Sequence, residues 1–389
     1  MLVVFCLAVF FCVYTYVIFP VLLHWVARSR ASRPGSDPWG ASAVAGSVSM
    51  GDESFELPFI SFVLAVHNEA DNLPAKIATI KAQNYPAEKM QIVIVSDGSD
   101  DGTFNLLENR DDVTWMHYEP AAGKPTALNR GVELATGEVI IFTDARQQLS
   151  PNAARVLVER LNKPGIAAVS GELVFGNSAT ADAANVSLYW MYEKWIRSNE
   201  SLLFSTTGAT GALYAIRKSD AVTLPADTLL DDFVIPIELL KDGRRTVLES
   251  RAMAYDTAEE DASQEFIRKV RTLAGNYQAF SRHKWLFSPA SNKVWWQFLS
   301  HKVARLLVPY AMLIAFIASI LSTSPILMLM AWLQAAFYIA GLLGLLSPSL
   351  SGGKVVNIIK VFLQLNAAAV VAAYNYFFGR ASVRWKAGS

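Results

Sequence analysis

Cysteine is nearly absent from this chain of 389 residues. The only two, Cys6 and Cys12, lie close to the amino end, inside the first apolar run. The rest of the chain therefore has no thiol from which to form a disulfide framework or a cysteine-ligated metal site. Any metal ion bound there must be held by oxygen or imidazole ligands.

Charged side chains are missing from long stretches at both ends of the chain. Residues 1–27 contain no Asp, Glu, Lys or Arg, and 48 uncharged residues separate Arg305 from Lys354. A helix needs roughly 20 apolar residues to cross a bilayer. We therefore expect one transmembrane helix over residues 1–27 and three over residues 304–380, with the turn-like sequence STSP between the first two of these three.

A cleaved signal peptide is the alternative explanation of the first apolar run. No basic residues precede this run, and it is longer than the roughly 7 to 15 apolar residues of a signal-peptide core. Both features favour a retained membrane helix.

Basic residues flank the charged central region on both sides. Arg28, Arg30 and Arg33 follow the first apolar run, and residues 266–305 contain eight Lys or Arg and no acid. The positive-inside rule therefore predicts a multi-pass protein of the inner (plasma) membrane with its central region in the cytoplasm. Three later crossings would put the basic tail, residues 381–389, outside, against the same rule, so its side stays open.

Composition divides the part between the membrane helices into three segments. Residues 28–57 form a polar linker rich in Gly, Ser and Ala, and residues 58–260 form the soluble domain. Residues 261–303 are predicted to form amphipathic interfacial helices, because tryptophans alternate with lysines there.

The soluble domain alternates between strand-like and helix-like segments. Three continuous apolar, β-branched runs are typical of strands buried on both faces of a parallel sheet. Helical compositions at 71–86 and 124–137 separate them, and a fourth strand-like segment lies at 113–118. This alternation predicts an α/β fold of the Rossmann-like kind. The three runs are residues 59–66, 91–96 and 138–143.

Each of the three runs ends in a polar cluster. HNEAD follows the first run, DGSDDG the second and DARQQ the third. One such loop alone could be an ordinary Asx turn and helix cap. Ligands of parallel sheets bind outside the carboxyl ends of the strands, so the three clusters together predict a binding site at that edge.

The order of motifs across residues 58–285 resembles that of the membrane-integrated family 2 glycosyltransferases related to cellulose, hyaluronan and poly-N-acetylglucosamine synthases. The motifs that carry the resemblance are AVHNEADNL, SDGSDDGT, GKPTALNRG, FTDAR, LLDDF and RKVRT. It implies a GT-A fold, that of nucleotide-diphospho-sugar transferases, joined to transmembrane helices. It also implies inverting transfer of a sugar from a nucleotide donor.

The resemblance implies a nucleotide site built from three loops. Ala65, His67 and Glu69 would lie against the base and ribose, Asp97 would meet the uracil end, and Lys124 would face the nucleotide. We therefore expect a UDP-linked donor.

The FTDAR sequence occupies the place of the family's D-x-D metal motif. Asp144 would hold Mg²⁺ or Mn²⁺, since a hard divalent cation stabilises the departing diphosphate. Arg146 stands where the second acid is expected, and a guanidinium binds phosphate or carboxylate rather than a cation. Either Asp144 alone holds the metal while Arg146 binds the diphosphate or a substrate carboxylate, or the site depends less on metal than its relatives do.

The LLDDF sequence matches the family's catalytic-base motif. Asp232 would accept the proton of the acceptor hydroxyl, with Asp231 as its neighbour. Repulsion between two carboxylates in one pocket would raise the pKa of one of them. The alternative is an acidic pair that stabilises a helix amino terminus.

Two arginines in RKVRT are three residues apart on a predicted helix. The resemblance makes Arg271 the contact to the diphosphate, and Arg268 could reach the same point. Thr272 replaces the tryptophan that forms part of the acceptor wall in the family, which puts the acceptor and processive synthesis in question. The alternative is a basic helix lying on anionic lipid.

The predicted reaction joins a nucleotide sugar to a hydroxyl of a glycan or lipid-linked acceptor, with no nucleic-acid partner. Four crossings make a self-contained polymer channel uncertain, so a homo-oligomer or an export partner could complete one. Two alternatives stay open: a polyprenyl-phosphate glycosyltransferase, and a catalytically silent export or scaffold subunit. A nucleotidyltransferase is disfavoured because the domain lacks a glycine-rich, basic triphosphate loop near its start.

Overall fold

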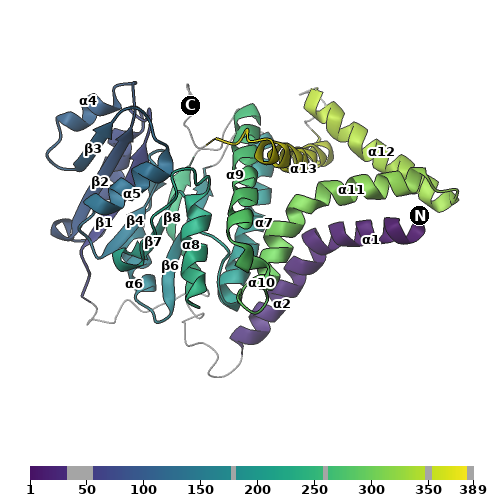
Figure 1. The fold of residues 1–389 in the computed structure, drawn as a ribbon, viewed down its shortest axis with the longest axis horizontal. Helices are drawn as coiled ribbons and strands as arrows, with labels where there is room; N and C mark the ends of the chain where they lie inside the picture. Colours follow the sequence, from purple (N-terminus) through teal and green to yellow (C-terminus); the bar gives the residue numbers. More distant parts are fainter. Residues whose placement is uncertain (33–55, 177–180, 257–261, 347–352, 383–389) are drawn as a thin grey trace.

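The computed structural model describes residues 1–32, 56–176, 181–256, 262–346 and 353–382. Most of the predicted linker and of the carboxyl-terminal tail lies outside the described residues. The described chain forms a sheet domain and a group of long helices that extend from one side of it (Figure 1).

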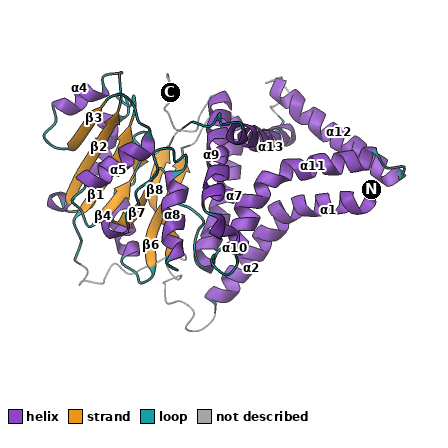
Figure 2. Cartoon of the chain, viewed as in Figure 1, coloured by secondary structure: helices purple, strands orange, loops and turns teal. Residues whose placement is uncertain are grey.

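The sheet domain is built on eight strands in the order β3-β2-β1-β4-β7-β6-β8-β5. Neighbours among β1 to β4 pair in parallel, whereas β7 is antiparallel to both β4 and β6, so the sheet is mixed (Figure 2). The strands are β1 Ile60–Val66, β2 Met90–Asp97, β3 Thr114–Tyr118, β4 Val139–Phe142, β5 Gln148–Leu149, β6 Ile166–Phe175, β7 Tyr214–Arg217 and β8 Arg245–Asp256.

These strands confirm the three predicted buried runs and the strand-like segment at 113–118. The parallel arrangement predicted for the sheet holds for β1 to β4 and fails at β7. A buried apolar run has the same pattern in either direction, so the sequence does not reveal the reversal. All seven residues of β1 are buried, as expected for a central strand covered on both faces.

Helices cover both faces of the sheet. One apolar cluster includes Leu73 and Leu157 of α3 and α6, and a second includes Leu128 and Phe233 of α5 and α8. These helices, with the short α4, are α3 Leu73–Lys81, α4 Thr103–Glu108, α5 Lys124–Leu134, α6 Ala153–Leu161 and α8 Asp231–Lys241.

Four helices in the described part of the chain are long and apolar enough to cross a membrane, the number that the sequence predicts. They cover Leu2–Ala31, Trp295–Ile320, Pro325–Leu346 and Val355–Phe377. The first comprises α1 Leu2–Val13, a π-helical turn Tyr14–Ile18 and α2 Phe19–Ala31. The others comprise α10 Trp295–Gln297, a π-helical turn Phe298–Val303, α11 Ala304–Ile320, α12 Pro325–Leu346 and α13 Lys354–Phe377.

Two further helices, α7 Ala181–Leu203 and α9 Ala262–Arg282, lie between the sheet domain and these apolar helices (Figure 1). Ile196 of α7 is buried against Phe19 and Leu23 of α2. Ala274 of α9 is buried with Ala368 of α13. The apolar helices are therefore packed against α7 and α9 rather than tethered by loops alone.

We predict that Gly137→Ala destabilises the sheet domain. A Cβ at Gly137 would lie 2.6 Å from the backbone carbon of Ile60 and the backbone nitrogen of Ser61, which cannot move independently of β1. Overpacking of this kind costs about 1 to 3 kcal/mol. Thermal unfolding of the purified full-length protein should show a lower Tm. Gly353→Ala is the matched control, since nothing lies within 4 Å of its added Cβ; equal Tm values for the two variants would contradict this account.

Candidate active site

The polar loops predicted from the sequence meet at one edge of the sheet. Strands β1, β2 and β4 are parallel, so their carboxyl ends lie together. His67 follows β1, Asp97 ends β2, and Asp144 follows β4. The edge thus gathers residues from three separate parts of the chain.

Asp97 fixes the loop in front of α5. Its side chain is fully buried, and its two carboxylate oxygens accept hydrogen bonds from the backbone amides of Ala122 (2.6 Å) and Gly123 (2.7 Å). The Nδ1 atom of His67 lies 2.7 Å from the backbone oxygen of Asp97. Asp97 therefore positions Lys124, the first residue of α5, and its contact to the uracil end of a nucleotide stays a prediction.

Lys124 joins acids from two other elements. Its Nζ donates to Asp144 Oδ1 at 2.9 Å and lies 3.5 Å from Asp231 Oδ1. Burial alone would lower the pKa of Lys124, but Asp144, Asp231 and Asp232 together raise it above its ordinary value. We call Lys124, Asp144, Asp231 and Asp232 the acid–lysine centre.

Asp232 is a half-buried member of this centre, next to the buried Asp231. Its Oδ2 accepts a hydrogen bond from the backbone amide of Gly211 at 3.1 Å, and a Cβ at Gly211 would lie only 3.2 Å from the same oxygen. Burial, followed by the charge of Asp231, raises the pKa of Asp232 to about 6, against the opposing effect of Lys124. The predicted rise in pKa thus has burial as its larger cause, and a carboxylate with this pKa suits proton capture near neutral pH.

Asp144 is the acid of the centre that is open to a ligand. Its side chain is 40% exposed, whereas that of Asp231 is 10% exposed. Among the described residues no group of three or more His, Cys, Asp or Glu could hold a metal by itself. Mg²⁺ commonly uses one or two carboxylates together with substrate phosphates, so a single open carboxylate fits a metal that arrives with the donor.

Arg146 is held by an acid that the sequence analysis missed. Its Nη2 donates to Asp256 Oδ2 at 2.7 Å, and Gln147 Nε2 donates to the same oxygen at 2.9 Å. Asp256 is the last residue of β8, and its side chain is 2% exposed. The guanidinium is therefore anchored to the end of β8, and its contact to a diphosphate or substrate carboxylate stays a prediction.

Lys76 is a second residue that the sequence analysis missed. It is fully buried, and its Nζ donates to Thr143 Oγ1 (2.6 Å) and to the backbone oxygen of Gln147 (2.8 Å). Burial lowers the pKa of Lys76 to about 7, although Asp144 and Asp256 act in the opposite direction. Its position three residues after Leu73, on the apolar face of α3, is the sequence signal that could have revealed it.

The first loop lies close to the same centre. Ala65 is buried in β1, and the backbone amide of Glu69 donates to Thr103 Oγ1 at 3.0 Å. Asn72 Nδ2 donates to Glu69 Oε2 at 2.7 Å. Burial raises the pKa of Glu69, and the hydrogen bond from Asn72 opposes this shift.

The two arginines of α9 are not brought into the acid–lysine centre. Both Arg268 and Arg271 are exposed, and Arg268 lies 3.4 Å from Glu265 of its own helix. Within the described part of the chain, Arg271 makes no hydrogen bond or ion pair. Their contact to a donor diphosphate remains a prediction.

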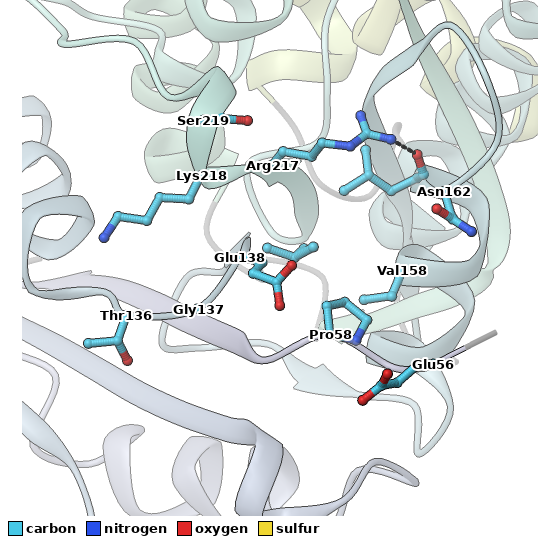
Figure 3. A pocket seen from close by; sticks show the side chains of 12 residues that line it. Glu56, Pro58, Thr136, Gly137, Glu138, Val158, Asn162, Arg217, Lys218 and Ser219 are labelled. Atoms are coloured by element: carbon cyan, nitrogen blue, oxygen red, sulfur yellow. Dashed lines mark hydrogen bonds between the residues drawn. The ribbon is translucent and has the colours of Figure 1, made fainter.

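A cavity of about 770 Å³ lies at the opposite end of the strands (Figure 3). Gly137 and Glu138, just before β4, line it together with Arg217 and Lys218. Both basic side chains already donate to backbone oxygens, Arg217 to that of Ile166 at 2.8 Å and Lys218 to that of Ala135. We therefore locate the chemistry at the carboxyl edge of the sheet, where the titratable groups converge, rather than in this cavity.

The mixed α/β sheet, with polar loops gathered at the carboxyl edge of its parallel strands, has the arrangement of the GT-A fold. Residues 61–222 match the family model described as Glycosyl transferase family 2. Residues 61–222 thus carry a glycosyltransferase family 2 domain.

Similar proteins agree with this assignment. The poly-beta-1,6-N-acetyl-D-glucosamine synthase of Staphylococcus aureus strain MSSA476 is 25% identical over 235 residues, 58% of this chain and 57% of that protein. The synthase of the same name from Staphylococcus epidermidis strain ATCC 35984 is 24% identical over 234 residues, 58% of this chain and 56% of that protein. The matches thus span little more than half the length of these relatives.

A solved structure shares the fold over nearly the whole chain. It is the mannosyltransferase PcManGT from Pyrobaculum calidifontis in complex with GDP-Man and Mn²⁺, with a TM-score of 0.70 and 20% identity, covering 97% of this chain and 99% of that one. The predicted GT-A fold joined to apolar helices is therefore confirmed.

We predict that kcat/KM falls as the pH drops below about 6, because protonated Asp232 cannot accept a proton. Lys124→Met removes the cation that favours ionised Asp232, so the acidic limb should move to higher pH, whereas Lys124→Arg should keep it in place. The exposed Lys163 supplies the control, Lys163→Met, which should leave the profile unchanged. If kcat/KM fell at the same pH in Lys124→Met and in the unmodified protein, Lys124 would not set the pKa of Asp232.

Proposed function

We propose that this enzyme is an inverting glycosyltransferase that moves a sugar from a UDP-linked donor to a hydroxyl of a polysaccharide or lipid-linked glycan. The observation that carries the proposal is Asp232, a half-buried carboxylate of raised pKa that accepts a hydrogen bond from the backbone amide of Gly211 in the same centre as the open Asp144. With Asp232 as the base and Asp144 at the leaving group, both would lie in one centre, as transfer to a hydroxyl requires.

The donor is assigned to the first three loops. Ala65, His67 and Glu69 hold the base and ribose, and Asp97 holds the loop that delivers Lys124. Mg²⁺ or Mn²⁺ bound at Asp144 would neutralise charge on the departing diphosphate. The Mn²⁺ bound together with GDP-Man in the mannosyltransferase complex supports a divalent ion.

Lys124 supplies the fixed positive charge of the leaving-group site. Its pKa is raised, so it stays protonated throughout the neutral range. Arg146 is held nearby by Asp256, and Arg146, Arg268 and Arg271 are assigned to further contacts with the diphosphate.

The transfer is assigned to a single displacement. Asp232 takes the proton of the acceptor hydroxyl, whose oxygen forms the new bond to the anomeric carbon as the bond to the diphosphate oxygen breaks. Asp231 faces Lys124 and assists by keeping the pKa of Asp232 high. One displacement at the anomeric carbon inverts its configuration.

Polysaccharide synthesis is supported by the names of the two staphylococcal relatives, which make a polymer of N-acetyl-D-glucosamine. A polyprenyl-phosphate acceptor is the second candidate, and its phosphate nucleophile would hardly need a base. The raised pKa of Asp232 favours a hydroxyl acceptor, whose proton needs a base. A catalytically silent export or scaffold subunit is disfavoured, because such a subunit would not need the acid–lysine centre.

We assign the reaction to the cytoplasmic face of the inner membrane. Four apolar helices support membrane integration, and the basic residues on both flanks of the soluble domain support its cytoplasmic side. In this arrangement residues 1–27 and 304–380 span the bilayer, and residues 58–260 form the catalytic domain. A second copy or an export partner would complete a polymer path.

A panel of UDP- and GDP-linked sugars, with product mass analysis, tests the proposal in purified membranes. One UDP-sugar should release UDP and extend a glycan, and Asp232→Asn should lower kcat by about 10²-fold or more with little change in the donor KM. Asp227→Asn is the control, because Asp227 is exposed and pairs with Arg282 away from the acid–lysine centre. Substantial turnover by Asp232→Asn would show that Asp232 is not the catalytic base.

Chelation tests the assignment of Asp144. Excess chelator should abolish turnover, added Mn²⁺ or Mg²⁺ should restore it, and Asp144→Asn should require at least about tenfold more metal for half-maximal rate. Asp112→Asn provides the comparison, since Asp112 pairs with Lys81 and Arg110 on the surface. An undiminished rate in excess chelator would show that turnover does not require a divalent metal ion.

A further inference from the structure

The segment between α7 and β7, residues 205–211, holds Asp232 in two places. The backbone amide of Ala209 donates to the backbone oxygen of Asp232 at 2.8 Å, and the amide of Gly211 donates to Asp232 Oδ2 at 3.1 Å. We call residues 205–211 the glycine loop. The two amides flank Thr210, so the orientation of the Asp232 carboxylate depends on where Thr210 is held.

Arg197 of α7 holds Thr210 through two nitrogens of its guanidinium group. Nη1 donates to Thr210 Oγ1 at 2.6 Å, and Nη2 donates to Ser170 Oγ in β6 at 2.9 Å. The same Ser170 oxygen accepts a hydrogen bond from the backbone amide of Thr210 at 2.9 Å and donates to the backbone oxygen of Gly171 at 3.0 Å. Arg197 thus fixes the side chain of Thr210 directly and its backbone through Ser170.

These contacts are buried and complete. Thr210 and Ser170 are 6% and 0% exposed, so water cannot readily replace a hydrogen bond that is lost there. The Ser170 hydroxyl already uses its one donor and both of its acceptor positions. A planar guanidinium offers two donors at a fixed separation, whereas a lysine ammonium is a single flexible point of attachment. Arginine is therefore the side chain that suits position 197.

The helix that carries Arg197 is attached to the apolar helices (Figure 1). Two residues after Arg197, Asn199 Oδ1 lies 3.0 Å from Nδ1 of His24 in α2. One residue further, Glu200 Oε1 lies 2.7 Å from Nδ1 of His301, in the π-helical turn before α11. Arg197 thus links a helix that is packed on the apolar helices to the glycine loop.

We propose that Arg197 is a positioning residue for the catalytic base, acting through Thr210 and the amide of Gly211. The inference rests on the proposed function, in which Asp232 is that base. A hydrogen bond to one oxygen of a carboxylate favours its ionised form and restricts its rotation. It leaves Asp232 Oδ1 to take the proton of the acceptor hydroxyl. In this role Arg197 need not touch the donor, so its loss should slow the transfer step without weakening donor binding.

Amide hydrogen exchange of the full-length protein tests, without any turnover, whether Arg197 holds the glycine loop. Arg197→Met should speed exchange about tenfold or more in peptides that contain Thr210 and Gly211. Peptides from β1 should exchange as in the unmodified protein, which shows that the sheet has folded. Thr210→Val removes the hydroxyl that Arg197 binds and should also speed exchange at Gly211, whereas Thr210→Ser should not. Arg155→Met is the matched control, since Arg155 pairs with Glu159 of its own helix.

Steady-state kinetics tests whether the glycine loop acts on the base. Arg197→Met should lower kcat about tenfold or more, while the donor KM changes less than about twofold. The fall of kcat/KM in acid should move to higher pH, because Asp232 loses a hydrogen bond that favours its ionised form. Arg197→Lys should recover part of the rate. Adding Thr210→Val to Arg197→Met should cost little more than Arg197→Met alone, since both changes release the same loop.

Three results would overturn the assignment. Unchanged exchange at Thr210 and Gly211 in Arg197→Met would show that Arg197 does not hold the glycine loop. A higher donor KM at an unchanged kcat would place Arg197 in donor binding. If kcat/KM fell at the same pH in Arg197→Met and in the unmodified protein, the loop would not act on Asp232.

Failure of the proposed function gives a different pattern. Full turnover by Asp232→Asn, together with faster exchange in Arg197→Met, would contradict the assignment of the base itself and not the contact between Arg197 and the glycine loop.

Discussion

The ion pairs of Lys124 are the interaction on which the active-site geometry depends. One ammonium holds Asp144, which follows β4, and Asp231, which begins α8, and its charge also reaches Asp232. Without this cation three carboxylates would repel one another at close range. The loop after β4 and the start of α8 are thus joined by a residue that Asp97 positions through the backbone of its loop.

Arg146, which stands where the family resemblance leads us to expect an acid, is held in place by other parts of the chain. Asp256 receives the guanidinium, and Lys76 holds the loop through Thr143 and the backbone of Gln147. Two cations and one buried acid now support the loop that carries Asp144. Under the proposed function, this arrangement would hold a single carboxylate in position for a metal that is otherwise bound by substrate oxygens.

The sequence predicts strands β1 to β4 and the edge where their loops meet, because buried strands are continuous apolar runs followed by polar clusters. It also predicts Lys124, Asp144 and Asp232 through the order of motifs. It does not predict that β7 runs antiparallel to β4, because a buried strand has the same apolar pattern in either direction. It also does not predict the pairing of Arg146 with Asp256, because the two residues are far apart in the chain. For Arg271, helical spacing predicts a face shared with Arg268, but it does not predict what that face of the helix contacts.

An experimental structure of the full-length enzyme with Mn²⁺ and a nucleotide-sugar donor that it uses tests the central claim most directly. We expect the diphosphate beside Lys124, the metal on Asp144, and the anomeric carbon between the diphosphate and Asp232. A donor bound in the cavity lined by Arg217 and Lys218, or a metal held without Asp144, would contradict the account.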